Sequence, residues 1–316
     1  MTKTREVGVK QGVILAAGHG SRIFPLSVDY PKPLLPVLNK PVIQYQIEVM
    51  RDAGIVDIII VIGILGSKIK TYFKNGSSFG VRISYVVDNN PQGIASSLMK
   101  AKAKISGPFA LFLGDIFVVR ADIKSAVDLF VRRGAEGVII GKREIDPEAV
   151  SHNFSVIIGD HGQVIKVIEK PKKPPSLFKG YGLYLFSAAI FEAISRTPRS
   201  TLRNEYEITD SIQTLIDIGG KVYSQEWDNW DFNLSYPRDL LDCNLKMLKE
   251  NKIDFLIGRD VQIGKNTRIV SSIVGDRAVL DNVWIEECLV FPEVEVSVVN
   301  TLVKRHILDK GLSIAV

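Results

Sequence analysis

Cysteine, histidine and long apolar runs are all scarce in this chain of 316 residues, which has two cysteines and four histidines. Cys243 and Cys288 stand outside any CxxC motif or Cys/His cluster. This argues against a structural zinc site and indicates a reducing compartment. No stretch approaches the apolar length of a membrane span, and the first residues lack the apolar core of a signal peptide. We therefore expect a soluble, cytoplasmic protein that does not contact a membrane.

Basic residues exceed acidic ones, giving a formal net charge of +5, but they are scattered and are not interleaved with aromatic residues. This pattern argues against nucleic acid as a partner. It favours anionic small molecules such as phosphates, with a merely solvated surface as the alternative. Hydrophobic residues make up 46% and charged residues 24%, which is typical of a globular protein, and the length indicates two domains.

Strand-like and helix-like patterns alternate over the first two thirds of the chain. This alternation predicts a right-handed, mostly parallel, Rossmann-like α/β sheet. In such sheets ligands bind beyond the carboxyl ends of the strands, where a glycine-rich loop and Asp115 both fall. The expected strands are Gly12–Ala16, Ile58–Ile62, Val81–Val87, Ala110–Leu113, Val138–Gly141 and Val164–Ile168, and the expected helices are Pro41–Ala53, Ala95–Ala103, Asp122–Arg133 and Pro237–Asn251.

The pattern changes after the last of these helices, so we place a first domain at residues 1–250 and a second at 251–316. Aliphatic residues then recur at six-residue steps, with two shifts of phase. Such hexads predict a short left-handed parallel β-helix, and chance alignment of ordinary apolar strands is the alternative. The tail allows about three coils, and a stack that short usually needs a partner, so we expect a homo-oligomer formed through the tail. The hexad positions are Ile257, Ile263 and Ile269, then Ile273, Val279, Ile285 and Phe291, then Val296, Leu302, Leu308 and Ile314.

A glycine-rich loop follows the first strand. Gly18 and Gly20 allow the backbone to approach a phosphate chain closely, and Arg22 adds a planar set of donors. Ten residues further on, Lys32 lies between two prolines that restrict its backbone. A dinucleotide-binding motif fails because Ile23 stands where its third glycine belongs, and no Walker motif is present. A plain strand-to-helix turn would explain the glycines but not Arg22 or the prolines.

The run LAAGHGSRIFPLSVDYPKPLLPV, which contains these residues, resembles the signature of the sugar-nucleotide pyrophosphorylases. The resemblance continues in order over nearly all of the first 250 residues, through Pro91–Ala95, Leu113–Asp115, Glu169–Pro171, Gly182–Tyr184, Glu205–Asp210 and Pro237–Leu241. It implies an enzyme that joins a nucleoside triphosphate to a sugar 1-phosphate, uses Mg²⁺ and releases pyrophosphate. The hexad tail is also similar to the β-helix appended to many members.

The resemblance implies a role for each matching residue. Asp115 would bind Mg²⁺, and as a carboxylate at a strand end it is a suitable hard oxygen ligand, with a turn or capping aspartate as the alternative. Arg22, Lys32 and Lys170 would be catalytic, Lys170 by meeting the sugar phosphate. The loop residues Ala16, Ala17, Gly18, Gly20 and Ser21, together with Asp88 and Gly93, would bind the nucleotide, and Ser155, Glu169 and Gly180 would bind the sugar phosphate.

Three positions depart from the family pattern. The second metal ligand is Asn233 if its place is counted from Pro237, or Asp231 if it is counted from Trp230. Ser155 stands where glycine is common. Asp88 stands where thymidylyl- and uridylyltransferases often carry glutamine, and an ionised carboxylate only accepts hydrogen bonds.

The substrates implied are dTTP or UTP with a hexose 1-phosphate, glucose first, because the Gly-Ile-Ala sequence at Gly93 resembles the thymidylyl and uridylyl types. N-acetylglucosamine 1-phosphate, or mannose 1-phosphate with GTP, stays open as an alternative. A catalytically silent, regulatory relative is the alternative from another class of protein. An acetyltransferase activity of the tail is disfavoured because the tail is short.

Overall fold

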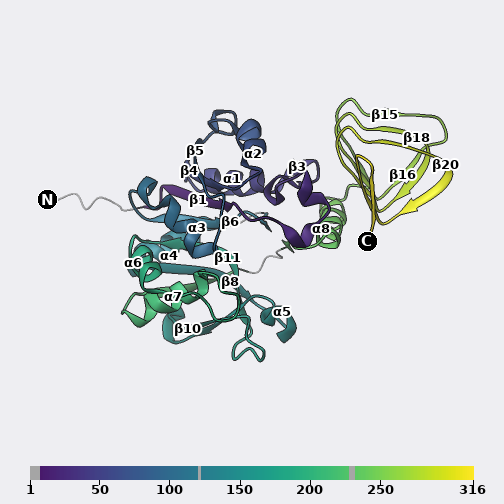
Figure 1. The fold of residues 1–316 in the computed structure, drawn as a ribbon. Coiled ribbons are helices and arrows are strands. Elements are labelled where there is room, and N and C mark those ends of the chain that lie inside the picture. The colour runs from purple at the N-terminus through teal and green to yellow at the C-terminus, as the bar shows by residue number, and fades with distance from the viewer. Residues whose placement is uncertain (1–7, 120–121, 228–231) are drawn as a thin grey trace. The chain divides into compact units, whose positions relative to one another are not determined.

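The computed structural model describes residues 8–119, 122–227 and 232–316 (Figure 1). The chain forms two compact units. The first, here called the sheet unit, contains Met1–His19 and Gln46–Asp231. The second, the tail unit, contains Gly20–Tyr45 and Phe232–Val316. The second half of the glycine-rich loop and the segment after it thus group with the C-terminal tail, while the domain boundary at residue 250 stays a prediction.

The sheet unit is built on a nine-stranded sheet in the order β10-β9-β11-β6-β1-β4-β5, with β8 on β11 and β12 on β8. The strands β1, β4, β5 and β6 are parallel, and β11 runs antiparallel between β6 and β8. The mostly parallel α/β sheet is therefore confirmed. The strands of this sheet are β1 (Gln11–Ala16), β4 (Asp57–Ile62), β5 (Arg82–Val87), β6 (Phe109–Leu113), β8 (Gly137–Arg143), β9 (Phe154–Ile158), β10 (Val164–Glu169), β11 (Phe178–Phe186) and β12 (Val222–Glu226).

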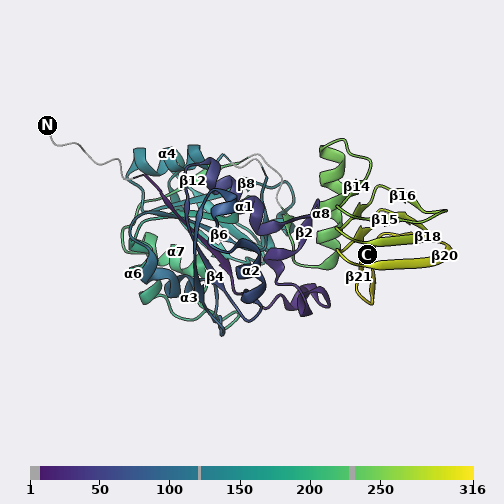
Figure 2. The ribbon, with the colours of Figure 1, turned by 90° about the horizontal axis from the view of Figure 1, so that it is seen from above.

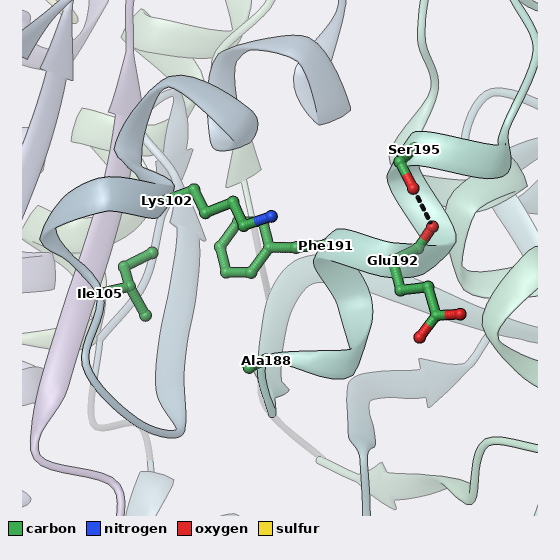
Figure 3. Close-up of a pocket in the computed structure, with 6 residues that line it drawn as sticks. All are labelled: Lys102, Ile105, Ala188, Phe191, Glu192 and Ser195. Atoms are coloured by element: carbon green, nitrogen blue, oxygen red, sulfur yellow. Dashed lines mark hydrogen bonds between the residues drawn. The ribbon is translucent and has the colours of Figure 1, made fainter.

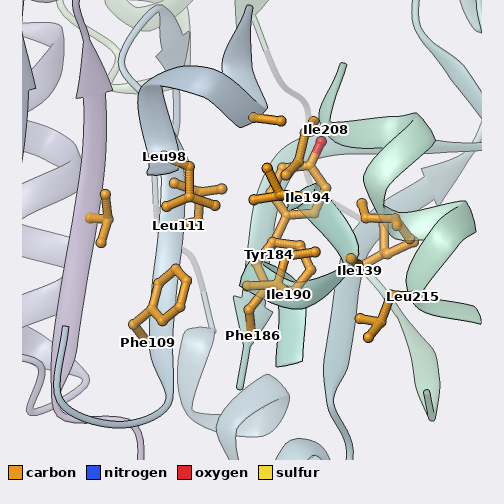
Figure 4. Close-up of a cluster of buried hydrophobic side chains, with 14 of the residues drawn as sticks. Leu98, Phe109, Leu111, Ile139, Tyr184, Phe186, Ile190, Ile194, Ile208 and Leu215 are labelled. Carbon is orange, nitrogen blue, oxygen red and sulfur yellow. The ribbon is translucent and has the colours of Figure 1, made fainter. Parts of the chain in front are cut away.

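Helices cover both faces of this sheet (Figure 2). On one face α3, α6 and α7 pack on one another over a shared apolar core, which includes Leu98, Phe109 and Tyr184 (Figure 4). On the other face α1 packs against Gly12, and α4 packs on β8, β11 and β12. The α-helices of this unit are α1 (Val42–Asp52, whose first residues belong to the tail unit), α2 (Gly66–Phe73), α3 (Ile94–Ala101), α4 (Ile123–Arg133), α5 (Pro147–Ser151), α6 (Ala189–Arg196) and α7 (Ile208–Asp217).

Local signals in the sequence set these boundaries. The helix α4 begins after Asp122, whose carboxylate accepts a hydrogen bond from the Ser125 amide, and it ends at Gly134 with a positive φ of 55°. The strand β4 forms from a run of consecutive aliphatic residues, all buried from Ile58 onward, as expected for a strand covered on both faces. The helix α2 was not among the expected elements.

The tail unit begins with the three 3-10 turns η1 (Ser21–Ile23), η2 (Leu26–Val28) and η3 (Lys32–Leu34). A small hairpin of β2 (Pro36–Val37) and β3 (Lys40–Pro41) follows. After the helix α8 (Pro237–Glu250), the strands β14 (Leu256–Ile257), β15 (Gln262–Ile263), β16 (Arg268–Val270), β17 (Ile273–Val274), β18 (Val279–Glu286), β19 (Leu289–Val290), β20 (Glu295–Lys304), β21 (His306–Asp309) and β22 (Leu312–Ala315) complete the unit.

These short strands stack in parallel as a small β-helix. In one stack Leu256 pairs with Ile273, Ile273 with Leu289, and Leu289 with Ile307. Residues with positive φ turn the corners of the first coil, where Asp260, Asn266 and Ser271 have φ values of 55°, 59° and 44°. The β-helix-like tail predicted from the hexads is thus present.

The hexads assign some inward positions wrongly. Leu302 pairs with Trp284 on the outer row and is 45% exposed, whereas its neighbour Val303 pairs with the buried Ile285. A shift of one residue exchanges the two faces of a strand, so the count of six fails where a corner adds or removes a residue. Ile263 is in the inward register but 51% exposed, because it lies in the first coil. Ile314 belongs to β22, which pairs antiparallel with β21 and ends the stack.

Candidate active site

The carboxyl ends of the parallel strands bring several predicted residues of the sheet unit together. The Leu15 carbonyl, near the end of β1, accepts a hydrogen bond of 2.9 Å from the Gly114 amide, just after β6. A side chain at Gly63, just after β4, would come within 2.6 Å of the Ala17 carbonyl oxygen. The Asp88 amide donates to the Ile62 carbonyl at 2.9 Å, which joins the ends of β5 and β4. The residues Ala16 to Gly18, Asp88 and Asp115 therefore share one edge of the sheet.

Gly18 is exposed at this edge, and no heavy atom lies within 4 Å of the position that a Cβ atom would occupy. Its φ is outside the positive range, so its backbone conformation does not require glycine. Packing in the folded chain gives no reason for glycine here. A close approach of the backbone to a ligand does give one.

The turn that carries Asp115 is held by a side chain that the sequence analysis did not identify. Gln46 of α1 is completely buried, and its Nε2 donates to the carbonyls of Leu113 and Ile116 at 2.8 Å each. These two carbonyls flank Gly114 and the half-buried Asp115. Since both partners only accept, the orientation of the amide is unambiguous. Gln46 thus fixes the turn, and its Oε1 is a buried acceptor without a partner among the described residues.

Asp88 and Gly93 lie around the start of α3. Asp88 is buried, and its carboxylate accepts a hydrogen bond of 2.7 Å from the Ser97 hydroxyl. Gly93 has a φ of +116°, and a Cβ atom there would lie 2.5 Å from the Tyr206 carbonyl oxygen. The backbone of Tyr206 forms hydrogen bonds on both sides of Gly93. Its carbonyl accepts from the Ala95 amide at 3.0 Å, and its amide donates to the Gln92 carbonyl at 2.8 Å. Glycine is therefore required at Gly93 by the backbone itself.

A second group of predicted residues surrounds the end of β10. The Glu169 carboxylate accepts a hydrogen bond of 2.7 Å from the Thr209 hydroxyl at the start of α7. Lys170 has a positive φ of 40°, and its amide donates to the Asn153 carbonyl at 2.8 Å. A lysine in the left-handed region is uncommon and marks a constrained position. Nearby, Arg203 holds the buried Glu207 with two hydrogen bonds of 2.6 and 2.9 Å.

The environment of Glu169 disfavours its charge. Burial, and then the neighbouring Glu207 carboxylate, raise the pKa of Glu169 above its ordinary value of 4.5, although the Thr209 hydroxyl and nearby cations act in the opposite direction. The folded chain therefore binds this proton more tightly than the unfolded chain. It follows that the contribution of Glu169 to stability falls as the pH rises from 4.5 through the raised folded value. Such a cost at neutral pH is typical of residues retained for function.

Ser155 and Gly180 are explained by packing in this structure. Ser155 is fully buried, and its hydroxyl donates to the Ser176 carbonyl at 2.8 Å. At Gly180 a Cβ atom would lie 1.9 Å from the ring of Phe154, so the ring fills the space of a side chain. Their role in binding the sugar phosphate stays a prediction.

The remaining predicted residues belong to the tail unit. Gly20 has a φ of +66°, and the Lys32 Cγ lies 3.1 Å from the position of its missing Cβ. Lys32 is only 8% exposed and so packs against the loop, whereas Ser21 and Arg22 are exposed. The Arg22 guanidinium lies 6.0 Å from the centre of the Tyr236 ring.

The candidate metal ligands also belong to different units, Asp115 to the sheet unit and Asn233 to the tail unit. Asn233 is exposed, and its side-chain oxygen accepts a hydrogen bond of 3.2 Å from the Ser235 hydroxyl. Asp231, the alternative to Asn233, lies outside the described residues. Within the described ranges no group of three histidine, cysteine, aspartate or glutamate side chains is arranged to hold a metal. Carboxylate and amide oxygens are each hard ligands of the kind that Mg²⁺ takes, so the role of Asp115 and Asn233 in binding a metal stays a prediction.

A cavity of about 420 Å³ lies at the opposite edge of the sheet (Figure 3). Its lining includes Ile105, which precedes β6, and Ala188, which follows the antiparallel β11. These residues mark the amino ends of the parallel strands, so the cavity is remote from the edge that carries Gly18 and Asp115. Its rim bears Lys102, whose ammonium lies 5.7 Å from the centre of the Phe191 ring. We assign no catalytic role to it.

Comparison with known proteins identifies the family of this chain. The family model described as nucleotidyl transferase matches residues 11–250, and the chain belongs to this family. It is therefore a nucleotidyltransferase, as its motifs predict. None of the helices in the described ranges combines the length and apolar character that a membrane span requires.

Three curated relatives illustrate the range of the family. The low-salt glycan biosynthesis nucleotidyltransferase Agl11 of Haloferax volcanii is 35% identical over 77% of this chain and 67% of its own. A glucose-1-phosphate thymidylyltransferase of Streptomyces griseus is 33% identical over 92% of this chain and 86% of its own. The UTP–glucose-1-phosphate uridylyltransferase AglF of Haloferax volcanii is 30% identical over 76% of this chain and 97% of its own.

Solved structures support the same fold. A crystal structure of a Bacillus anthracis protein assigned as a glucose-1-phosphate thymidylyltransferase has a TM-score of 0.67 and 27% identity, covering 74% of this chain and 93% of its own. A UDP-glucose pyrophosphorylase complexed with UDP-glucose has a TM-score of 0.70 and 24% identity, covering 77% of this chain and 99% of its own. The second likeness concerns the fold alone.

Proposed function

We propose that this enzyme transfers a nucleotidyl group from dTTP or UTP to a hexose 1-phosphate, with glucose 1-phosphate first among the candidates. The sheet edge at Gly18 and Asp115 carries the proposal, because an open glycine and an aspartate in a turn held by Gln46 suit a bound polyphosphate and its cation. The names of the Streptomyces griseus and AglF relatives support glucose 1-phosphate and a pyrimidine nucleotide.

The reaction is an in-line attack of the sugar phosphate on the α-phosphorus of the triphosphate, with pyrophosphate as the leaving group. Two polyanions must meet, so alignment and charge neutralisation supply most of the catalysis. In this proposal the amides of Gly18, Gly20 and Ser21 hold the triphosphate. Arg22 neutralises the departing pyrophosphate, and Lys32 neutralises charge near the α-phosphate.

The cation of this reaction is expected to be Mg²⁺. When bound, it would neutralise charge on the phosphates, and Asp115 together with Asn233 or Asp231 would hold it. Gln46 donates to the Leu113 and Ile116 carbonyls and so fixes the backbone of the turn that carries Asp115. The Gln46→Leu variant should therefore bind Mn²⁺ more weakly than the natural chain, as measured by electron paramagnetic resonance.

The base and the sugar are assigned to separate residues. Asp88 already accepts from Ser97, and its carboxylate can accept a further hydrogen bond from the N3–H of uracil or thymine, or from the N1–H and N2–H₂ edge of guanine. For the sugar, Lys170 would meet the phosphate. Glu169 would accept hydrogen bonds from the sugar hydroxyls. Burial destabilises the charged form of this carboxylate, and hydroxyl donors would stabilise it.

A matrix of nucleotides against sugar 1-phosphates, scored by pyrophosphate release and product mass, tests the proposal. We expect the highest kcat/KM for dTTP or UTP with glucose 1-phosphate. Preference for N-acetylglucosamine 1-phosphate, or for GTP with mannose 1-phosphate, would replace our substrate assignment and leave the chemistry intact. Binding without turnover in every combination would instead indicate a regulatory relative.

We also propose that the enzyme is a homo-oligomer formed through its tail, and that it works in the cytoplasm, as its cysteine usage suggests. The exposed Ile263 and Phe255 at the first coil are apolar groups that a second copy could cover. Light scattering after size exclusion should give a mass above 35.0 kDa, the mass of one chain. A replacement of both residues by serine should return the protein to that mass.

A further inference from the structure

The segment Gly20–Tyr45 contains most of the predicted phosphate contacts and is itself held by the C-terminal tail. It groups with residues 232–316 in the tail unit, although nearly 200 residues separate the two stretches in the sequence. Three sets of contacts within this unit fasten the segment. All of them involve α8 or the β-helix.

The first set centres on Tyr30. Its hydroxyl donates to the Asp309 carboxylate at 3.3 Å, and its ring lies edge-on to Phe291 with 5.0 Å between ring centres. Asp309 is buried at the end of β21, where its carboxylate also accepts from the Lys310 amide at 2.8 Å. Burial, and then the Asp309 charge, raise the pKa of Tyr30 above its ordinary range, so the phenol is protonated and can donate at neutral pH.

The other two sets hold the hairpin of β2 and β3. The Asn39 amide group donates to the Val274 carbonyl of β17 at 2.8 Å. The side chain of Asn244, completely buried in α8, donates to the Pro36 carbonyl and accepts from the Leu38 amide, at 2.9 Å each. The end of the segment is therefore fixed by backbone and side-chain hydrogen bonds to two different parts of the tail.

Tyr30 lies between the residues that the reaction needs. Its amide closes the turn from Leu26 at 3.0 Å, and Lys32 follows two residues later at the start of η3. Lys32 in turn packs against Gly20 at the start of the segment. A displacement of Tyr30 would consequently move Lys32 and the second half of the glycine-rich loop together.

From these contacts we infer that the β-helix tail positions the triphosphate-binding segment, and that Tyr30 and Asp309 are the positioning residues. The tail would then be part of the catalytic machinery of a single chain, in addition to any role in assembly. The inference rests on the proposed function for its kinetic consequences. The physical link between Tyr30 and Asp309 stands independently of them.

Tyr30→Phe is the sharpest test, because it removes the hydroxyl and keeps the ring against Phe291. The loss of this long hydrogen bond, counted at the strength of an ordinary one, should lower kcat/KM for the triphosphate by about three- to ten-fold. The KM for the sugar phosphate should not change. Asp309→Ala should behave like Tyr30→Phe, the double variant should add nothing further, and Asp309→Asn should restore activity because its side-chain oxygen still accepts.

Tyr85→Phe is the matched control. Its hydroxyl donates to the Lys74 carbonyl at 2.7 Å within the sheet unit, and its loss should leave both kinetic constants unchanged. Amide hydrogen exchange supplies a readout that needs no turnover. Exchange over residues 20–35 should be faster in Tyr30→Phe than in the natural chain or the control.

The two proposals fail in different ways. If the natural chain turns over no substrate pair but exchange over residues 20–35 rises in Tyr30→Phe, the proposed function is wrong and the physical link is supported. If the natural chain is active and Tyr30→Phe matches it in triphosphate kinetics and in exchange, the inference is overturned. A Tyr30→Phe variant that loses activity equally toward both substrates, with unchanged exchange, would also overturn it.

Discussion

Replacement of Gly18 by alanine separates the demands of folding from those of the ligand. No heavy atom lies within 4 Å of the new methyl group, and the backbone has no positive φ that would strain an alanine. Alanine also has less conformational freedom than glycine in the unfolded chain. The free energy of unfolding should therefore stay the same or rise by about 0.4–1 kcal/mol.

Catalysis should respond in the opposite direction. If the Gly18 backbone contacts a phosphate, a methyl group at this position should displace that phosphate by about 1 Å. A displacement of this size lowers the rate by roughly 100-fold. The effect should appear in kcat/KM for the triphosphate. Half of the prediction, the unchanged stability, follows from the structure, and the other half follows from the proposed function.

The assay combines thermal unfolding with initial rates of pyrophosphate release. Gly107→Ala is the matched control, since Gly107 also has no heavy atom within 4 Å of its Cβ position and precedes β6 at the opposite edge of the sheet. Both variants should unfold like the natural chain, and only Gly18→Ala should lose activity. A fully active Gly18→Ala variant would refute the assignment of this loop to the phosphate chain.

Three further predictions concern the sheet unit. Asp115→Ala should fold normally and lose turnover, and near-normal activity in a Mg²⁺ titration would show that the metal ligand is assigned wrongly. Glu169→Gln should unfold at a higher temperature than the natural chain at pH 7, because it removes a carboxylate whose folded pKa is raised, and it should lose sugar-phosphate affinity. If Glu169→Gln and the natural chain unfold at the same temperature at every pH from 4 to 8, the stability effect of Glu169 is contradicted. Gly180→Ala should cost about 1–3 kcal/mol in urea unfolding, since its Cβ would overlap the Phe154 ring, and an unchanged midpoint would count against the packing described.

Much of the fold follows from patterns that are local in the sequence. The aliphatic run at Ile58–Ile62 becomes the buried strand β4, and Asp122 and Gly134 begin and end α4 where their side-chain chemistry predicts. The hexads predict parallel stacking in the tail, but they misplace Leu302 because a corner shifts the register by one residue. These local signals are reliable because hydrophobic periodicity and helix capping depend on residues that are close together in the sequence.

The enzyme class follows from the sequence, since the glycine-rich loop and the ordered motifs of the first 250 residues are contiguous patterns with a chemical reason for each residue. How those residues are supported depends on contacts that form only in the folded chain. Gln46 bonds to carbonyls beside Asp115, Thr209 bonds to Glu169, and Tyr30 bonds to Asp309, across separations of 67, 40 and 279 residues. No local pattern specifies such pairs, because a buried hydrogen bond depends on which backbone groups the folded chain brings within about 3 Å of each other.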